Sequence, residues 1–280
     1  MKKNKKVKIK GSKEGCCNIC WQSSQLTRDH IPPKACVKPT ALELITLTQY
    51  LTKPSEKPVI SQSGLCIPSI CGNCNNNLLG TEYDPELISV SKQIASLLKS
   101  QQELGLLLPE TIKLNVKPQR LIRAVIGHTL AGRSPTLEQP HASAPFPKAL
   151  RNYFLDPSKN IADEIEVYYW VYPFNNQVVI NGFSINSVIG EGNISGSCLL
   201  KFFPLAFWIV WDKPPSFPIN TQKISSEKFK GLDESCEIVI DLRNFPSINY
   251  PEVPDSDNHF IIYHNESTVL AQPKKPKGFG

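Results

Sequence analysis

The chain lacks the sequence features of several large classes of protein. No apolar run is long enough to span a bilayer, because the most apolar stretch, residues 198–211, is short and is interrupted by Lys201 and Pro204. The basic start MKKNKK precedes VKIKGSKEG instead of an apolar segment, so it does not match an export signal. A P-loop, a Gly-x-Ser-x-Gly elbow and internal repeats are also missing from the sequence. These absences favour a cytoplasmic protein and argue against NTPases and serine hydrolases.

The composition and length are those of a globular protein. The 280 residues, 40% of them hydrophobic and 20% charged, can bury the core of one large domain or of two ordinary ones. The net charge of +6 is concentrated at the two ends, with seven lysines and no acid in residues 1–13 and more lysines in residues 274–277. Such a tail either binds phosphate backbones without reading sequence or only keeps the chain in solution.

Residue patterns divide the chain into three parts. Residues 1–13 form the basic tail. Residues 14–105 contain two close cysteine pairs and a predicted helix from Pro85 to Gln102. Residues 106–280 begin with a predicted helix over residues 118–131 and continue with strand patterns. This last part is predicted to be a mostly antiparallel α+β domain, whose role is substrate selection, partner binding or regulation.

Two finer predictions concern the connections between these elements. Residues 37–65 are polar and punctuated by proline, which indicates an insertion or a long loop. Residues 165–171 alternate apolar side chains on one face, and we expect them to pair with residues 177–180 across Asn175 and Asn176. Further strands are expected in SCLLKFF, AFWIVW, CEIVIDL and HFIIY.

The cysteines predict a metal site. Cys17 and Cys20 form one C-x-x-C pair and Cys71 and Cys74 form a second. In a reducing compartment such pairs bind metal more often than they form disulfides, and four thiolates make a closed tetrahedral zinc site. Zinc there is expected to be structural. Three other cysteines are substitutes for these ligands: Cys16, Cys36 and Cys66.

The stretch LTRDHIPPK places an acid and a histidine at the end of a strand or in a loop. Pro32 and Pro33 fix their own backbone angles and favour extended geometry in the residue before them. A zinc ion shared by the two cysteine pairs, here called the zinc clip, is expected to bring Asp29 and His30 close to the segment CNNNLLG. This gathers oxygen and nitrogen groups suited to a hard divalent cation and a general base.

In order, CxxC, DHIPPK and IPSICGNCNNNLLG, followed by an aspartate, resemble the HNH endonucleases of the zinc-knuckle type. The resemblance covers residues 16–90 and implies a ββα-metal fold. It implies that His30 is the general base that activates water, and that Asp29 and Asn75 hold a catalytic Mg²⁺ or Mn²⁺. Arg28 and Lys34 are then candidates for phosphate contacts.

The chain departs from the family's pattern at two places. The middle residue of the pattern, usually an asparagine that orients the histidine, falls near Ser63, with Gln62 close by. Ile70 is an extra residue before Cys71, and a long insertion precedes it. The ligand on the helix therefore stays open among three asparagines, with Asn75 first: Asn75, Asn76 and Asn77.

The sequence thus predicts a metal-dependent endonuclease that acts on nucleic acid, DNA in the first place. By analogy with bacterial HNH proteins, its role would be defence against foreign DNA. The alternatives are a zinc-dependent nucleic-acid-binding protein that does not cut, and a structural zinc protein whose C-terminal domain binds a partner. The poor match near Ser63 to the middle residue of the family's pattern favours the first alternative, whereas the presence of Asp29 and His30 favours cutting.

Several other signals are set aside. The glycine loop GEGNISG, residues 190–196, departs from the nucleotide-binding spacing and is expected to be a hairpin turn. Cys198 and Cys236 lie in strand patterns and are expected to be core residues. The remaining histidines lack clustered ligands in the sequence and are interpreted as structural or surface residues: His128, His141, His259 and His264.

Overall fold

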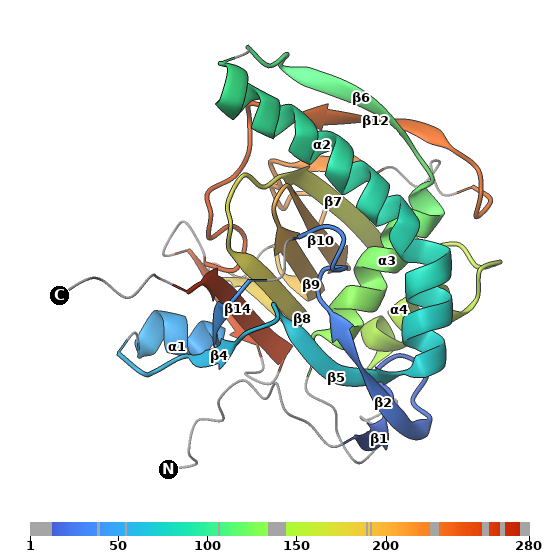
Figure 1. Cartoon of the computed structure of the whole chain (residues 1–280). Helices are drawn as coiled ribbons and strands as arrows, with labels where there is room; N and C mark the ends of the chain where they lie inside the picture. Colours follow the sequence, from blue (N-terminus) through green and yellow to red (C-terminus); the bar gives the residue numbers. More distant parts are fainter. Residues whose placement is uncertain are drawn as a thin grey trace.

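The structure, a computed structural model, describes ten stretches of the chain. They are residues 13–37, 40–53, 55–105, 107–133, 144–188, 190, 192–224, 230–253, 258–263 and 267–274. The predicted basic tail, apart from Lys13, and two of the set-aside histidines lie outside the described residues: His141 and His264. Figure 1 shows a mixed α+β molecule in which helices pack against antiparallel sheets.

In Figure 1 a long helical segment runs from the lower right of the view to its top, and it starts beside a small three-stranded sheet. Its strands are β1 (Glu14–Cys16), β2 (Ser23–His30) and β5 (Cys66–Cys71), in the order β1-β2-β5 and antiparallel. A π-helix, η1 (Asn73–Tyr83), follows β5 and continues into α2 (Asp84–Leu104). The predicted helix over residues 85–102 is confirmed. It ends at Gly105, whose φ of 65° suits glycine best.

A nine-stranded sheet forms the larger part of the fold. The order is β11 (Gln222–Ile224), β7 (Ile165–Val171), β10 (Leu205–Trp211), β9 (Ile194–Phe202), β8 (Gln177–Ser187), β14 (Thr268–Pro273), β3 (Leu42–Ile45) and β4 (Val59–Ser61), and β13 (His259–Tyr263) also pairs with β8. The pairs are antiparallel. The expected antiparallel character of this part is therefore confirmed.

The predicted hairpin of β7 with β8 is wrong. β10 and β9 lie between these two strands, and β7 pairs along its whole length with β10. The connection Phe203–Pro204 joins β9 and β10 into a tight hairpin, and both of these strands are almost entirely buried. A strand with two buried faces is stabilised by neighbours on both edges. The β9–β10 hairpin therefore lies between β7 and β8, and β10 is the neighbour of β7, although β8 follows β7 in the sequence.

Residues 37–65, expected to be an insertion or a long loop, contain structure. They include β3, the short helix α1 (Leu47–Thr52) and β4, and β3 pairs with β14 from the far end of the chain. Thr46 starts α1 with a capping box, in which its hydroxyl accepts from the Gln49 backbone while the Gln49 side chain accepts from the Thr46 backbone. The insertion thus forms one edge of the large sheet.

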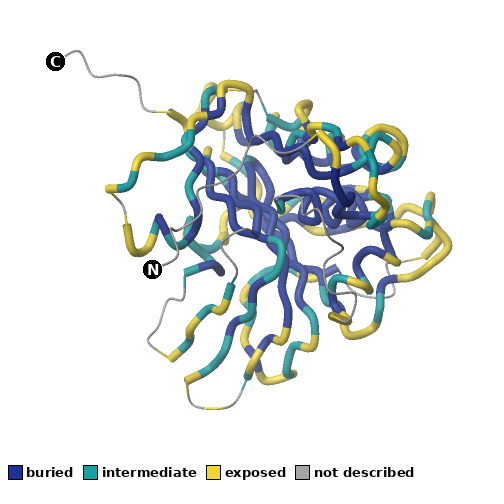
Figure 2. The backbone as a smooth tube through the Cα atoms, turned by 90° about the horizontal axis from the view of Figure 1, so that it is seen from below, coloured by how far each residue is buried: buried dark blue, intermediate teal, exposed yellow. Residues whose placement is uncertain are grey.

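Helix α3 (Pro118–Ala131) joins the two ends of the molecule. It begins and ends where the sequence predicts, at residues 118 and 131, and nearly all of its residues are buried. It packs against η1, α2, α4 (Pro145–Leu155) and the large sheet. A third, two-stranded sheet pairs β6 (Thr111–Val116) with β12 (Cys236–Asp241). In Figure 2 the buried backbone gathers in the interior of the molecule. One core cluster contains residues from both predicted parts, such as Cys17 and Ala271, and a second cluster contains mainly residues of the large sheet. The predicted boundary between residues 105 and 106 stays a prediction.

None of the described helices has the length and apolar character needed to cross a membrane.

The lysine that interrupts the apolar stretch of the sequence lies in β9 and is buried. Lys201 is fully buried, and its ammonium donates to the backbone oxygens of Ile248 at 2.7 Å and Tyr250 at 3.0 Å and to the carboxylate of Glu252. Burial lowers the pKa of Lys201 and raises the pKa of Glu252.

We expect Lys201→Met to lower the free energy of unfolding by about 3–5 kcal/mol, because it leaves a buried carboxylate without its cation. Urea unfolding followed by circular dichroism measures this difference. The double variant Lys201→Met/Glu252→Gln is the matched control and should recover part of the loss. Equal stabilities of Lys201→Met and wild type would contradict the buried pair.

Candidate metal centre and the end of strand β2

The four cysteines of the two C-x-x-C pairs lie close together. Cys17 and Cys20 lie in the turn between β1 and β2, Cys71 ends β5, and Cys74 is in the first turn of η1. Their Sγ atoms lie within 4.8 Å of one another, and those of Cys20 and Cys71 are 3.8 Å apart. A tetrahedral zinc site with Zn–S bonds of 2.3 Å requires S–S separations of about 3.8 Å. The cluster can therefore hold a structural metal ion such as zinc.

The local electrostatics also favour a cation at this place. A hydrogen bond with the Cys74 thiol lowers the pKa of Cys17 to about 5, and the Cys71 backbone N–H donates to the Cys17 sulfur at 3.3 Å. Burial raises the pKa of Cys20 to about 12, and the hydrogen bond to Cys17 raises that of Cys74. The Cys17 thiol therefore loses its proton more readily than an isolated thiol, and a bound dication would compensate the charge of the thiolates.

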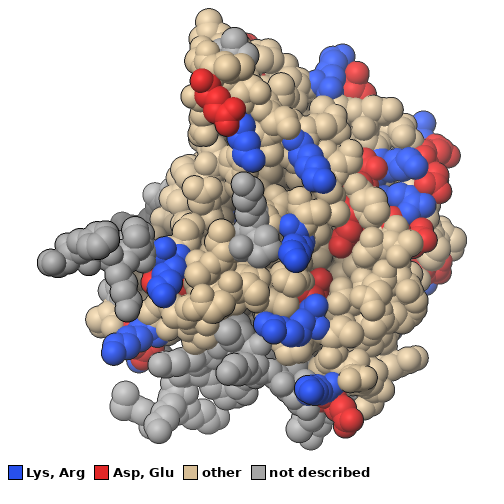
Figure 3. All heavy atoms as spheres, viewed as in Figure 1, with Lys and Arg blue, Asp and Glu red and all other residues tan. Residues whose placement is uncertain are grey.

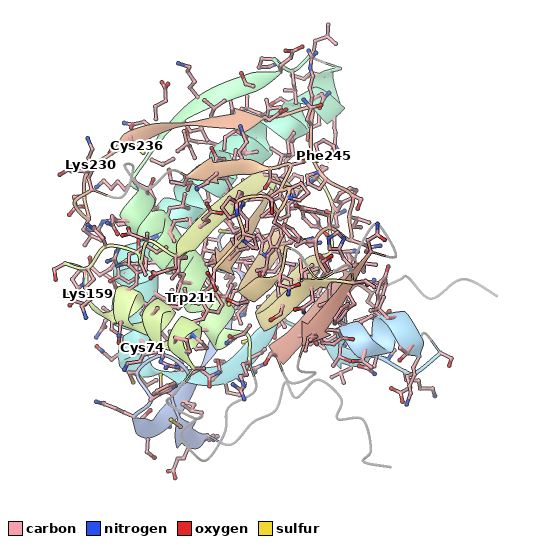
Figure 4. All side chains as sticks on the ribbon, turned by 180° about the vertical axis from the view of Figure 1, so that it is seen from behind. Cys74, Lys159, Trp211, Lys230, Cys236 and Phe245 are labelled. Atoms are coloured by element: carbon pink, nitrogen blue, oxygen red, sulfur yellow. The ribbon has the colours of Figure 1, made fainter. Side chains whose placement is uncertain are left out.

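Among the described residues this is the one group of three or more His, Cys, Asp or Glu side chains with metal-binding geometry. The three cysteines considered as substitutes are not part of it: Cys16, Cys36 and Cys66. Figure 4 labels Cys74 at the end of the molecule that holds β1, β2 and α4. Cys198 is buried in β9 and Cys236 is half-buried in β12, as their strand patterns predict.

Strand β2 ends at His30 in a well-defined position. His30 lies opposite Cys66 in the β2–β5 register, and the Ile31 backbone N–H donates to the Leu65 carbonyl at 3.0 Å. The imidazole of His30 is half-buried and makes no hydrogen bond or ion pair with the part of the chain that the structure describes. The backbone bond to Leu65 fixes the strand end, a task that the family's pattern gives to the middle residue. Ser63 and Gln62 are both exposed.

Asp29 points into the interior, where it meets a residue that the sequence did not connect with it. Its Oδ2 lies 3.1 Å from Nδ1 of His128, and Nε2 of His128 lies 2.9 Å from Oδ1 of Asp84. Asp29 is 5% exposed and His128 fully buried. The ring therefore joins β2, α2 and α3 through two carboxylates.

The charge of His128 follows from these contacts. Burial lowers its pKa, but the carboxylates of Asp84 and Asp29 outweigh burial and raise the pKa to about 10. At neutral pH the ring is an imidazolium between two carboxylates. His128 is buried and pairs with two carboxylates, which fits the interpretation of it as a structural residue. Asp29 and Asp84 are 99 and 44 residues away along the chain, so no local spacing signals the contact.

Of the three candidate asparagines, Asn75 is the one that reaches strand β2. Its Nδ2 donates to Thr27 Oγ1 at 2.9 Å and to the Arg28 carbonyl at 3.4 Å. Asn76 and Asn77 are exposed, and the Asn77 amide donates to Asn73 within the helix. Asn75 is thus attached to the strand that carries His30.

A catalytic Mg²⁺ or Mn²⁺ does not fit the Asp29 carboxylate as the structure places it. The Asp29 carboxylate faces a buried imidazolium, which leaves no room for the several waters that Mg²⁺ keeps. The Nδ2 of Asn75 donates to Thr27 and Arg28, whereas its Oδ1, the atom that would bind an ion, takes no part in these two bonds. The ligand role of Asn75 therefore stays a prediction, while the Asp29 carboxylate is engaged with His128.

The candidate phosphate contacts Arg28 and Lys34 are both exposed and flank His30 in the sequence. On the face shown in Figure 3, basic side chains lie singly, several beside acidic ones, and do not merge into a continuous patch. Binding of nucleic acid on this face would thus depend on a few separate basic groups. Comparison of the chain with protein-family models, with curated proteins and with solved structures finds no match.

Proposed function

We propose that the protein is an endonuclease of the HNH type that hydrolyses phosphodiester bonds in nucleic acid, with DNA as its substrate and defence against foreign DNA as its role. The observation that carries the proposal is His30 at the fixed end of β2, in a module clipped by four cysteines. The cysteines and the Asp-His element come from the resemblance in sequence, and their positions supply further support.

The order of elements supports the same proposal. β2 pairs antiparallel with β5, and the helical segment η1–α2 follows directly. This is the succession strand, strand, helix that a ββα fold requires. The clip lies at the end of the β2–β5 pair opposite His30, because Cys71 pairs with Leu26 and Cys66 pairs with His30. A metal there would hold the two strands together and take no part in the chemistry.

In the proposed reaction His30 acts as general base. A histidine accepts protons near neutral pH, and its position at a strand end holds it on rigid backbone. His30 takes a proton from water, the water oxygen attacks phosphorus, and the bond from phosphorus to the leaving oxygen breaks. That oxygen takes a proton from solvent. Arg28 and Lys34 offer positive charge for the phosphate, and no step is assigned to Asp29 or Asn75.

A specific observation favours a second candidate, a nucleic-acid-binding protein that does not cut. The carboxylate that the resemblance assigns to the catalytic ion is neutralised by His128. A module of this kind keeps the zinc clip and the exposed basic residues but lacks the ion that stabilises charge on the phosphate. Binding without cleavage is its expected behaviour.

One experiment separates the two candidates. Purified protein is incubated with plasmid DNA and with structured RNA, in Mg²⁺, in Mn²⁺ and without added divalent ion, beside His30→Ala. We expect wild-type protein to cut DNA and His30→Ala to cut at least about 100-fold more slowly, the usual effect of removing a general base. Zinc content and circular dichroism of the two proteins should agree.

The matched control is His259→Ala, because His259 is also half-buried but lies in β13. This variant should cut as wild type does. Cleavage by His30→Ala at the wild-type rate would refute the role of His30. Salt-sensitive DNA binding without cleavage in every condition would instead establish the second candidate.

A further inference from the structure

A pocket of about 290 Å³ lies between the large sheet and the turn that contains Cys17 and Cys20. Asn18 and Trp21 of this turn form one wall, residues of α3 and α4 form a second, and β8 and β9 close it. Its volume is close to the lower end of the range for small-molecule sites, about 300–1,000 Å³. It lies near the opposite end of β2 from His30, so it is separate from the proposed reaction.

Two arginines of this pocket have no acidic partner among the described residues. Arg151 is 7% exposed, its guanidinium lies over the ring of Trp21, and its Nη2 is buried without a hydrogen bond. Nε of the half-buried Arg133 is likewise buried without a partner. Burial lowers the pKa of Arg151 to about 10. A buried guanidinium that lacks its hydrogen bonds is costly, so an anion at this place would stabilise the fold.

The rest of the lining adds to the positive potential. None of the described residues that line the pocket carries a carboxylate. The first turn of α4, from Ala144 to Pro147, opens onto the pocket and contains no acidic residue. The helix dipole favours an anion there, although Pro145 and Pro147 have no N–H, so the turn offers few donors and the arginines carry the site. In addition, the N–H donors of an arginine guanidinium match the oxygen geometry of phosphate and carboxylate groups.

Two further features define the body of the ligand. Trp21 and Phe146 line the pocket, and the Arg151 guanidinium covers one face of the Trp21 ring, so a flat aromatic group would stack on the Phe146 ring or on that guanidinium. The amides of Asn18 and Asn181 donate to the backbone carbonyls of Arg133 at 2.8 Å and of Leu130 at 3.2 Å. This fixes both amides and leaves their oxygens to accept hydrogen bonds from a ligand.

We propose that this pocket binds one nucleotide unit, with its phosphate on Arg133 and Arg151 and its base beside the Phe146 ring and the asparagine amides. The ligand is either a free nucleoside monophosphate or a terminal nucleotide of a strand, since both present the same phosphate and base. The proposal is independent of phosphodiester cleavage and is tested by binding alone.

The test is isothermal titration of the full zinc-loaded chain, without added divalent ion. The probes are the four ribonucleoside 5′-monophosphates, inorganic phosphate, unphosphorylated adenosine and a 5′-phosphorylated tetranucleotide of DNA. We expect at least one monophosphate or the tetranucleotide to bind, and phosphate and adenosine to bind at least about tenfold more weakly, the cost of losing one charged contact or the stacked ring. Tighter binding of the tetranucleotide than of the monophosphates assigns the site to strand ends, and the reverse order to free nucleotides.

Two variants test the place of binding. Arg133→Gln removes a charge that is only half-buried, and Ala144→Trp fills the pocket from an exposed position, so both should fold. Each should weaken binding at least about tenfold, as expected for the loss of a charge-assisted hydrogen bond or of the binding space. Arg243→Gln, at an exposed arginine paired with Glu110, is the matched control and should bind as wild type does. The proposal is overturned if no nucleotide probe binds, if inorganic phosphate binds as well as the nucleotides, or if both pocket variants bind like wild type.

Discussion

Replacing Cys20 by serine is expected to remove the metal ion from the chain and to abolish cooperative folding of the end that contains β1, β2 and β5. Cys20 and its three partners have sulfur atoms within 4.8 Å of one another, in the arrangement of a closed tetrahedral site. Structural zinc contributes about 10–16 kcal/mol of binding free energy in zinc-finger peptides, as much as the whole stability of an ordinary domain. Losing one of four ligands therefore exceeds what the local packing can replace.

The measurement is zinc content by elemental analysis, together with thermal unfolding followed by circular dichroism. Wild type should contain about one zinc per chain, as one four-cysteine site requires, and Cys20→Ser almost none. Cys236→Ser is the matched control, because Cys236 is also half-buried but lies in β12, outside the cluster. A chelator should reproduce the effect of Cys20→Ser on wild type and have no further effect on that variant. Full zinc content in Cys20→Ser would show that the ion is bound elsewhere.

The second large effect is expected at His128, where alanine should lower the free energy of unfolding by about 3–5 kcal/mol at neutral pH. The substitution leaves Asp29 and Asp84 facing each other across a cavity, with their shared cation removed. Urea unfolding measures the loss. The variant His128→Leu/Asp29→Asn/Asp84→Asn should recover much of it, because no buried charge remains in that variant.

The dependence of this effect on pH has a definite sign. The pKa of His128 is raised from 6.5 to about 10 in the folded state, so the charged ring contributes its full stabilisation below about pH 6.5. That contribution is lost as the pH rises through about 10. The stability difference between wild type and His128→Ala should therefore shrink between about pH 7 and pH 10.5. A constant difference over this range would mean that the ring is neutral in the folded protein.

The sequence predicts those parts of the structure that depend on local patterns. The helices at residues 84–104 and 118–131 follow from apolar spacing and from prolines in their first turns. The four-cysteine cluster follows from two C-x-x-C pairs, because the two-residue gap limits how the thiols can point. Strand patterns likewise locate β9, β10, β12 and β13.

The contacts between distant segments could not be predicted in this way. The hairpin assigned across Asn175 and Asn176 fails because strand pairing depends on what fills the space beside β7, and not on the turn alone. The link from Asp29 to His128 depends on how α3 lies against β2, which no spacing within one segment encodes. The pocket around Arg151 likewise combines residues from the turn between β1 and β2 and from four further elements, α3, α4, β8 and β9. Such sites can be recognised only in the assembled fold.

The pairing of β3 with β14 has a consequence for the order in which the chain acquires its structure. Leu42 lies opposite Pro273, so β3 acquires this neighbour only after residue 273 has left the ribosome. Until then β3 and the adjoining hairpin partner β4 have an unsatisfied edge, which is a template for association with other chains. Such late closure of a long loop is slow compared with helix formation. The edge formed by β3 and β4 in the nascent protein therefore depends on β14, which is synthesised much later, for its protection.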